Sequence, residues 1–262
     1  AEPAPPASSM SVVIRTYTDA RWDNLVDAVD SVREQADPPR EIVVVVDHEP
    51  RLADRVSHHF RDVVVVDNHQ TRGASGSLNA GIAAARSPII ALLDDDAVAT
   101  TTWLRHLVTP YRDDRILGVG GQIIPVWSAG KPAWFPEEFY WVVGCTYRGV
   151  PAVAAPIRNL IGANMSFRRS VWETVGGFRM GVGAVGGGSL LRGEETEFCI
   201  RASQSWPDRV WLYEPEAQVF HHQVHGRSKW SYFRSICYGQ GLTKAQISHL
   251  LGSHDSLDSE RA

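Results

Sequence analysis

The sequence predicts a single α/β domain in which a central, mostly parallel, twisted sheet is flanked by helices. Two observations carry this prediction. Short apolar runs rich in valine and isoleucine at residues 11–14, 41–46 and 63–66 suit strands that are buried on both faces of a parallel sheet. Segments with helical or loop character separate these runs. A succession of strand, helix and strand is typical of a doubly wound, nucleotide-binding architecture.

Two helices and a fourth strand follow from the spacing of apolar residues. Trp22, Leu25, Val29 and their neighbours recur at helical intervals over residues 22–32. Residues 74–86 are rich in alanine and leucine and predict a second helix that ends just before a proline. The apolar run 88–93 comes next and predicts a strand.

Three acidic residues, Asp94, Asp95 and Asp96, directly follow the predicted strand 88–93. Ligands of doubly wound sheets bind at the carboxyl ends of the strands. Adjacent carboxylates repel one another, and their hard oxygens favour magnesium, calcium or manganese. The segment therefore predicts a metal site, with a solvated acidic turn as the alternative.

Asp47 ends the strand 41–46 and should reach the same edge of the sheet. An acidic residue there is well placed to accept hydrogen bonds from a ribose or a base, although it could equally be a turn residue before His48. The sequence has no Walker phosphate loop, and no Gly-x-Gly-x-x-Gly follows the first strand. These absences count against a P-loop NTPase and a dinucleotide dehydrogenase.

Composition sets further limits. The chain has 262 residues and a formal net charge of -4, so we expect no nucleic-acid partner. Its three cysteines are widely spaced and should be reduced thiols. Because we find neither a signal peptide nor a run long enough to span a membrane, we expect a cytoplasmic protein. Residues 1–10, rich in proline and alanine, are expected to form a disordered tail.

The second half contains candidates for the acceptor side of a site. Aromatic residues gather between 127 and 148, where Trp141 and others could stack on a sugar or simply pack in the core. The glycine-rich segment 180–193 could be an acceptor lid or a plain connection. The C-terminal residues 226–262 should form a helical extension. Its aromatic and basic residues suit either a peripheral membrane contact or packing on the sheet.

Glu194, Glu195 and Glu197 begin a predicted helix. Glu197 and Arg201 are four residues apart and should form an ion pair. Glu194 or Glu195 could be a catalytic carboxylate or could serve only the helix start, whose dipole should keep Glu195 ionised.

Further along the chain, His221 and His222 could complete a metal site or contact a diphosphate. The alternative for each of these histidines is a surface or core role.

Taken in order, these segments resemble those of family 2 glycosyltransferases, which have the Rossmann-like GT-A fold. The matching segments are residues 11–17, 41–47, 71–82, 91–96 with Trp103 and Leu104, 161–169, 175–178 and 193–201. The resemblance covers residues 11–225. It implies a nucleotide-sugar-binding half at 11–122 and an acceptor-binding half at 123–225.

The resemblance implies transfer of one sugar, with inversion, from a nucleotide-diphosphate sugar. We expect a UDP-sugar as donor, magnesium or manganese as cofactor, and a saccharide, lipid-linked or small-molecule hydroxyl as acceptor. Glu195 would be the catalytic base and Glu194 would orient the acceptor. The implied donor- and acceptor-side residues are Thr16, Tyr17, Asp47, Arg72, Asn79, Asp94, Asp95, Trp141 and Asn164, with Asp95 able to replace Asp94 or Asp96. The implied metal ligands are Asp94, Asp96, His221 and His222.

Two features depart from the family pattern. Glu194 and Glu195 stand where the family usually has Glu-Asp, so the presumed base is one methylene longer. The Gln-x-x-Arg-Trp motif of processive members is absent, which favours single transfers over polymer synthesis.

Three other functions are open on the sequence alone. A sugar nucleotidyltransferase would need a glycine-rich, basic loop after the first strand, and residues 16–19 do not form one. A non-catalytic nucleotide-sugar-binding module would tolerate loss of Glu195. A metal-dependent hydrolase of nucleotide sugars would release the sugar without an acceptor.

Overall fold

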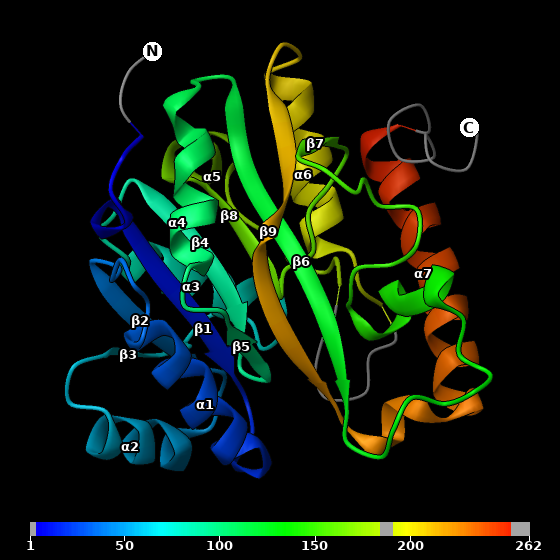
Figure 1. The fold of residues 1–262 in the computed structure, drawn as a ribbon, viewed down its shortest axis with the longest axis horizontal. Coiled ribbons are helices and arrows are strands. Elements are labelled where there is room, and N and C mark those ends of the chain that lie inside the picture. Colours follow the sequence, from blue (N-terminus) through cyan, green and yellow to red (C-terminus); the bar gives the residue numbers. More distant parts are fainter. Residues whose placement is uncertain (1–3, 184–190, 253–262) are drawn as a thin grey trace.

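A computed structural model of the protein describes residues 4–183 and 191–252. Within them the chain forms one curled sheet of 9 strands with helices on both faces (Figure 1). The strands are β1 (Met10–Thr16), β2 (Glu41–Val46), β3 (Val64–Asp67), β4 (Ile89–Asp94), β5 (Ala97–Ala99), β6 (Ile116–Trp127), β7 (Ala155–Ile157), β8 (Asn164–Arg168) and β9 (Val210–Gln223). Their order across the sheet is β3-β2-β1-β4-β8-β6-β9-β5, and β7 pairs with β9.

The first four strands of this order are parallel, as the sequence predicts. β1 lies between β2 and β4, and β3 extends the sheet beyond β2. Because these strands run in the same direction, Thr16, Asp47 and Asp94 all emerge at one edge of the sheet. This edge carries the candidate site.

The second half of the sheet is mixed. β8 is antiparallel to both β4 and β6, whereas β9 runs parallel to β6 along most of its length. The far end of β9 pairs antiparallel with the short β5, with Ala97 opposite His221. This pairing brings the histidine of β9 back to the aspartates that precede β5.

Apolar side chains are buried on both faces of the sheet, as a doubly wound fold requires. Alternating residues of β1 and β2 point to opposite faces, so Val12 and Val44 enter one core while Val13 and Val43 enter the other. The helices are α1 (Trp22–Arg33), α2 (Pro50–His59), α3 (Ala74–Ala84), α4 (Trp103–Val108), α5 (Arg169–Val175), α6 (Glu194–Ser205) and α7 (Trp230–Leu251). α1, α2 and α4 contribute to the first core, and α3, α5 and α6 to the second.

Five short 3-10 helices complete the described elements. They are η1 (Ala7–Ser9), η2 (Asp19–Arg21), η3 (Thr109–Arg112), η4 (Glu137–Val143) and η5 (His225–Ser228). η4 packs against α7, and η5 leads from β9 into α7. No helix among the described residues is long and apolar enough to cross a bilayer.

The ends of the chain differ from the sequence prediction in one respect. The tail expected at residues 1–10 is shorter, because Ala7 is buried and Met10 starts β1 with its side chain in the core. The helical extension begins at Trp230 and packs through Ile236 and Ile247. Residues 253–262 lie outside the described residues, as do 184–190 of the predicted lid.

The predicted ion pair of α6 is present and is more deeply buried than a helix-surface pair. Glu197 is inaccessible to solvent, and its carboxylate accepts hydrogen bonds from Arg201 (2.6 and 2.9 Å) and from Arg179 (2.7 Å). Arg201 also donates to the backbone carbonyls of Val175 and Gly177. The network ties α6 to the end of α5 and to the segment that follows it.

We predict that Glu197→Gln destabilises the fold by about 3 kcal/mol, because it removes the charge that two guanidinium groups share in a buried site. Chemical denaturation by urea measures this difference. Glu173→Gln is the matched control, since Glu173 also pairs with an arginine four residues away but is mostly exposed. It should cost no more than about 0.5 kcal/mol. Equal losses of unfolding free energy in the two variants would contradict the conclusion that the buried Glu197 pair stabilises the fold more than an exposed pair does.

Candidate active site

The three aspartates after β4 have different surroundings. The side chain of Asp94 is 30% exposed, while those of Asp95 and Asp96 are almost completely buried. The strand ends at Asp94, and the next two residues form the turn into β5. Asp94 is therefore the member of the cluster that faces solvent.

Asp95 is held by protein groups. Its carboxylate accepts a hydrogen bond from the Thr16 hydroxyl (2.8 Å) and one from Arg21 (2.8 Å). Burial raises the pKa of Asp95, and the Arg21 cation opposes that rise. The expectation that Asp95 could replace Asp94 or Asp96 is not supported, because its oxygens are already used. Thr16 is likewise buried, with its hydroxyl donating to Asp95, and its contact with a donor stays a prediction.

Asp94, Asp96 and His221 form a cluster whose ligand atoms all lie within 4.8 Å of one another. His221 Nε2 is 2.9 Å from Asp96 Oδ1 and 3.9 Å from Asp94 Oδ2. Asp96 Oδ2 is buried without a hydrogen bond, although Arg21 (3.2 Å) and Arg227 (3.5 Å) lie close to it. A buried carboxylate oxygen without a hydrogen-bond donor is what a metal ligand looks like in the absence of its ion.

The chemistry of the cluster suits a divalent cation. Two carboxylates and one imidazole form a mixed oxygen and nitrogen set that can hold a divalent cation such as manganese or magnesium. The other ring nitrogen of His221, Nδ1, lies 3.7 Å from the buried Cys145 thiol. Such an outer contact fixes the orientation of the ring.

Electrostatics ties this histidine strongly to its aspartate. Burial alone would lower the pKa of His221, but Asp96 raises it to about 10. Burial alone would raise the pKa of Asp96, but His221 and Arg21 hold it well below its usual range. In the protein without a cation, an imidazolium thus balances the carboxylate.

His222 does not join the cluster. Side chains alternate between the two faces of a strand, so His221 and His222 point to opposite sides of β9. His221 is buried against the aspartates, while His222 is only half-buried and contributes its backbone N–H to the Asp96 carbonyl (2.8 Å). The sequence left both histidines open as ligands. Because side chains alternate along β9, only His221 faces the aspartates.

The first turn of α6 carries Glu194 and Glu195, as predicted. Glu195 is partly exposed and packs closely on Gly162. If residue 162 carried a Cβ atom, that atom would lie only 2.1 Å from Glu195 Oε1. Glu194 is buried, and its Oε2 accepts the Gly193 N–H (3.0 Å) and approaches Gly183. Glycine at position 162 therefore makes room for the Glu195 carboxylate, and Glu194 faces the glycine-rich segment.

The expectation that the helix start keeps Glu195 ionised is not met in the unliganded protein. Burial and the neighbouring Glu194 carboxylate raise the pKa of Glu195 to about 8, and Asp94 adds to the rise. Burial and the neighbouring carboxylates outweigh the favourable dipole of the helix start. The pairing of Leu93 with Asn164 sets Asp94 and the loop around Gly162 at the same end of β4 and β8, so Glu195, which packs on Gly162, lies on the side of the metal cluster.

Asp47 organises the loop in front of α3. Its carboxylate accepts hydrogen bonds from Asn68 (2.7 Å) and the Gly73 N–H (3.0 Å), and His48 Nδ1 lies 2.9 Å away. Burial alone would raise its pKa, but these hydrogen bonds lower it. Asp47 is thus at the predicted edge but largely buried, so its carboxylate positions the loop that would surround a nucleoside.

Asn79 is used for packing. Its side-chain oxygen accepts hydrogen bonds from the Trp172 indole (2.9 Å) and the Phe178 N–H (2.9 Å), and its amide donates to the Phe178 carbonyl (2.8 Å). With these groups engaged and the residue buried, the structure does not place Asn79 as a donor contact.

Asn164 is also engaged within the protein. Its amide donates to the carbonyls of Gln122 (3.1 Å) and Ala217 (2.7 Å), and its oxygen accepts from the Trp103 indole (2.7 Å). It joins β8 to β6 and β9 and adjoins a pocket only at its edge. Asn164 thus has a structural role, and the sugar contact stays a prediction.

The remaining predicted residues lie nearer the surface. Tyr17 follows β1 and is partly exposed, with the Arg21 guanidinium 5.1 Å from the centre of its ring. Arg72 is exposed just before α3, and Trp141 is half-buried in η4. Tyr17 and Arg72 thus stay accessible at the carboxyl-end edge of the sheet.

Three arginines of the site were not singled out from the sequence. Arg15 lies in β1, 3.8 Å from Asp94, and the four carboxylates around it raise its pKa even though burial opposes this. Arg21 and Arg227 flank Asp96. Arg15 could have been recognised as a cation within an apolar strand. Arg21 and Arg227 reach the aspartates only through the tertiary fold.

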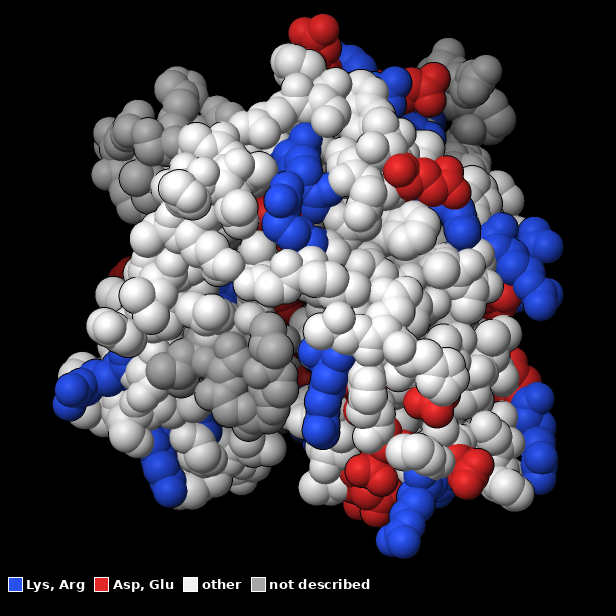
Figure 2. Space-filling model, turned by 180° about the vertical axis from the view of Figure 1, so that it is seen from behind, with Lys and Arg blue, Asp and Glu red and all other residues white. Residues whose placement is uncertain are grey.

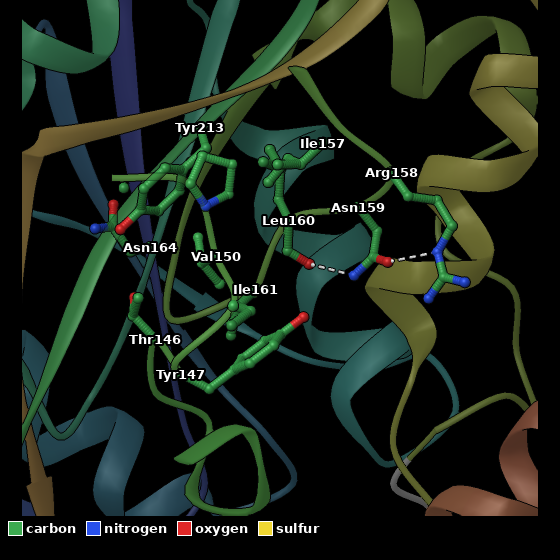
Figure 3. A pocket seen from close by; sticks show the side chains of 14 residues that line it. Thr146, Tyr147, Val150, Ile157, Arg158, Asn159, Leu160, Ile161, Asn164 and Tyr213 are labelled. Carbon is green, nitrogen blue, oxygen red and sulfur yellow. Dashed lines mark hydrogen bonds between the residues drawn. The ribbon is translucent and has the colours of Figure 1, made fainter. Parts of the chain in front are cut away.

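A pocket of about 250 Å³ lies beside the loop that supports Glu195 (Figure 3). Tyr147, Val150, Leu160 and Tyr213 are among its lining residues, and Arg158 stands on the side toward α6. The loop continues from Ile161 to Gly162, against which Glu195 packs. Its lining combines apolar and aromatic side chains with the polar groups of Arg158 and Asn159.

An α/β fold that carries an acidic cluster at the carboxyl ends of its parallel strands is consistent with a glycosyltransferase. The sequence profile described as "Glycosyl transferase family 2" matches residues 11–176. A glucosyl-dolichyl phosphate glucuronosyltransferase of Haloferax volcanii is 37% identical over 241 residues, which cover 90% of this chain and 76% of that protein. The chain belongs to glycosyl transferase family 2.

Solved structures confirm the GT-A fold. The mannosyltransferase PcManGT from Pyrobaculum calidifontis, in complex with GDP-Man and Mn2+, aligns with a TM-score of 0.59 at 18% identity, covering 98% of this chain and 77% of that one. GalNAc-T7, solved with UDP, GalNAc and Mn2+, aligns with a TM-score of 0.61 at 20% identity. That alignment covers 83% of this chain and 44% of GalNAc-T7.

We predict that His221→Ala weakens Mn²⁺ binding by at least about tenfold, because it removes one of three ligands. Calorimetric titration of Mn²⁺ in the presence of UDP measures this. His222→Ala is the matched control on the opposite face of β9 and should leave the affinity unchanged. Thermal unfolding of both variants shows whether either substitution disturbs the fold. Equal affinity losses in the two would contradict the assignment of His221.

Proposed function

We propose that the protein transfers one sugar, with inversion at the anomeric carbon, from a UDP-sugar to a hydroxyl of a lipid-linked saccharide, and that the reaction needs a divalent cation. One observation carries the proposal: the pairing of Leu93 with Asn164 sets the Asp94–Asp96–His221 cluster and the loop on which Glu195 packs at the same end of the sheet. A donor diphosphate bound at the cluster would therefore present its sugar toward that carboxylate.

The donor side of the cleft must bind a diphosphate that gains negative charge as the bond to the sugar breaks. Asp94, Asp96 and His221 would hold a cation that supplies positive charge against this leaving group. Arg15, next to Asp94, adds a fixed cation from the protein. Asp47 and the loop it orders would surround the nucleoside.

The acceptor side needs a base. In an inverting displacement, a carboxylate removes the proton of the attacking hydroxyl while the oxygen forms its bond to the anomeric carbon. Glu195 is the proposed base, because it is partly exposed in the cleft and its raised pKa makes it a stronger proton acceptor than an ordinary carboxylate. Glu194 is turned toward Gly183 and would support the first turn of α6.

The relative from Haloferax volcanii, a glucosyl-dolichyl phosphate glucuronosyltransferase, supports a lipid-linked acceptor and suggests glucuronate as the sugar transferred. The pocket beside Glu195 is consistent with this class of acceptor, since Leu160, Val150 and two tyrosines line it. Arg158 at its edge could contact an acceptor phosphate.

Transfer assays test this proposal directly. The protein would be incubated with Mn²⁺, a glucosylated polyprenyl phosphate and either UDP-glucuronate or UDP-glucose, and the product's anomeric configuration read by NMR. Release of UDP with formation of an inverted glycoside supports the proposal. Sugar release without transfer would indicate a hydrolase, and donor binding without turnover of any acceptor would indicate a binding module.

We predict that Glu195→Gln lowers turnover by about 10²–10⁴-fold while donor affinity barely changes, because the amide keeps the size of the side chain but cannot accept the proton. Steady-state rates and calorimetry with UDP separate these two effects. Glu194→Gln, one residue away, should reduce turnover less than about tenfold. A larger effect at Glu194 than at Glu195 would place the base at the neighbouring residue.

The raised pKa of Glu195 predicts how activity depends on pH. The base works only when deprotonated, so kcat/KM should rise with pH and level off above about 8 in the absence of other titrations. Glu194 and Asp94 raise this pKa and Arg15 lowers it, so a cation bound near Asp94 should shift the midpoint downward. The rise should be absent from the residual activity of Glu195→Gln, and a rise that persists there would assign it to another group.

A further inference from the structure

Five aromatic side chains form a continuous cluster where η4 and its preceding loop meet the start of α7. Trp230 stacks on Phe233 with ring centres 5.1 Å apart, and Trp134 meets both edge-on at 5.1 and 5.6 Å. Phe135 and Phe139 contact Phe233 from the other side, at 5.4 and 5.3 Å. We call these five residues the aromatic face.

Much of the aromatic face is open to solvent, although Phe135 is buried in the core and Phe233 is half-buried. Trp230 is 56% exposed and Trp134 is 40% exposed. Along α7 the exposed apolar surface continues with Tyr238, at 68%, and Leu242, at 47%. Exposed apolar patches of this kind, rich in tryptophan, mark surfaces that contact another phase or partner.

α7 is apolar on two sides. Its inward stripe of Ile236, Gly239, Thr243 and Ile247 is buried against the rest of the protein. Tyr238 and Leu242 lie on the outward side, where a water-facing helix would carry charged residues. Packing on the domain therefore explains one side of the helix and leaves the outward side without a partner among the described residues.

Charge around the aromatic face is positive. Residues 217–254 contain no Asp or Glu but carry Arg227, Lys229, Arg234 and Lys244. Lys229 and Arg234 are exposed, and neither has a carboxylate partner among the described residues. Figure 2, seen from behind, shows few acidic side chains on the side that carries α7, whereas the opposite edge mixes both signs.

Two acidic residues do lie near the aromatic face, in η4. Glu137 pairs with Lys131 (2.9 Å) and Arg148 (3.1 Å), and Glu138 pairs with Arg148 (3.2 Å). Their charges are thus balanced locally. Lys229 and Arg234 remain as the net charge of this surface.

The aromatic face adjoins the active site. Arg227 lies 3.5 Å from Asp96, and Trp230 begins α7 three residues later. η4 ends at Val143, and a Cβ atom on the next residue, Gly144, would lie 3.4 Å from the His221 ring. Figure 1 shows the start of α7 at the same end of the molecule as the end of β9. A partner bound at the aromatic face would therefore lie next to the Asp94–Asp96–His221 cluster.

We propose that the aromatic face, with Lys229 and Arg234, docks the protein onto an anionic lipid bilayer. Tryptophan rings are favoured at the boundary between headgroups and acyl chains, and lysine and arginine next to them are attracted by anionic lipids. The docking would bring the cleft to the membrane surface. Its usefulness for catalysis rests on the proposed lipid-linked acceptor, but the binding itself does not.

Sedimentation with lipid vesicles tests the docking without donor or acceptor. We expect the protein to bind vesicles of phosphatidylcholine and phosphatidylglycerol at 7:3, and to bind pure phosphatidylcholine at least about tenfold more weakly. Trp134→Ala/Trp230→Ala should weaken binding at least about tenfold. Lys229→Glu/Arg234→Glu should weaken it by at least about fivefold for each cation removed.

Arg51→Glu/Arg61→Glu is the matched control, since it makes the same charge change at two exposed residues around α2. It should bind as the unmodified protein does. Mn²⁺-dependent binding of UDP, measured on every variant, keeps a failure of docking separate from a failure of the proposed function. The proposal is overturned by no binding to anionic vesicles, by equal binding to neutral ones, or by equal loss in the control. It is also overturned if light scattering shows that the face instead joins two copies of the chain.

Discussion

The antiparallel pairing of β5 with the end of β9 is the constraint on which the site depends. It places His221 opposite Ala97, one residue after Asp96, and so closes a cluster from residues 125 positions apart in the chain. The buried carboxylate of Asp96 then needs compensating charge, which His221, Arg21 and Arg227 supply. Without this strand pairing, the aspartates would be an acidic turn after a strand.

The second half of the site depends on close packing around α6. Gly162 lets the Glu195 side chain approach the loop after β7, and the buried Glu197 pair anchors the helix that carries it. Because Glu194 and Asp94 surround Glu195, its carboxylate retains its proton more strongly than an exposed glutamate would. The same arrangement thus makes Glu195 a good proton acceptor and sets repelling carboxylates close together in the unliganded protein. Donor and cation binding would relieve this repulsion.

The surface around the site extends this arrangement toward the acceptor. The pocket beside Glu195 and the aromatic face of α7 lie on the half of the molecule that the mixed strands β6, β7 and β9 organise. Arg227 connects them, since it contacts Asp96 from η5, directly before α7. The proposed metal site and the proposed docking surface are therefore joined by one short segment of chain.

Much of this could be predicted from the sequence, because strands buried on both faces must be apolar throughout and because acids at strand ends are conspicuous. The parallel half of the sheet, the start of α6, the Glu197–Arg201 pair and the edge carrying Asp47 and Asp94 follow from such local patterns. Which side chains remain available could not be predicted, because it depends on partners far away in the chain. Thr16 and Arg21 donate hydrogen bonds to Asp95. Trp172 and Phe178 donate to Asn79, and Trp103 donates to Asn164. Which of His221 and His222 faces the aspartates was decided only by the face of β9 on which each side chain lies. Local sequence thus determined the elements and their chemistry, whereas only the tertiary structure decided which polar groups were already satisfied and which were left for a ligand.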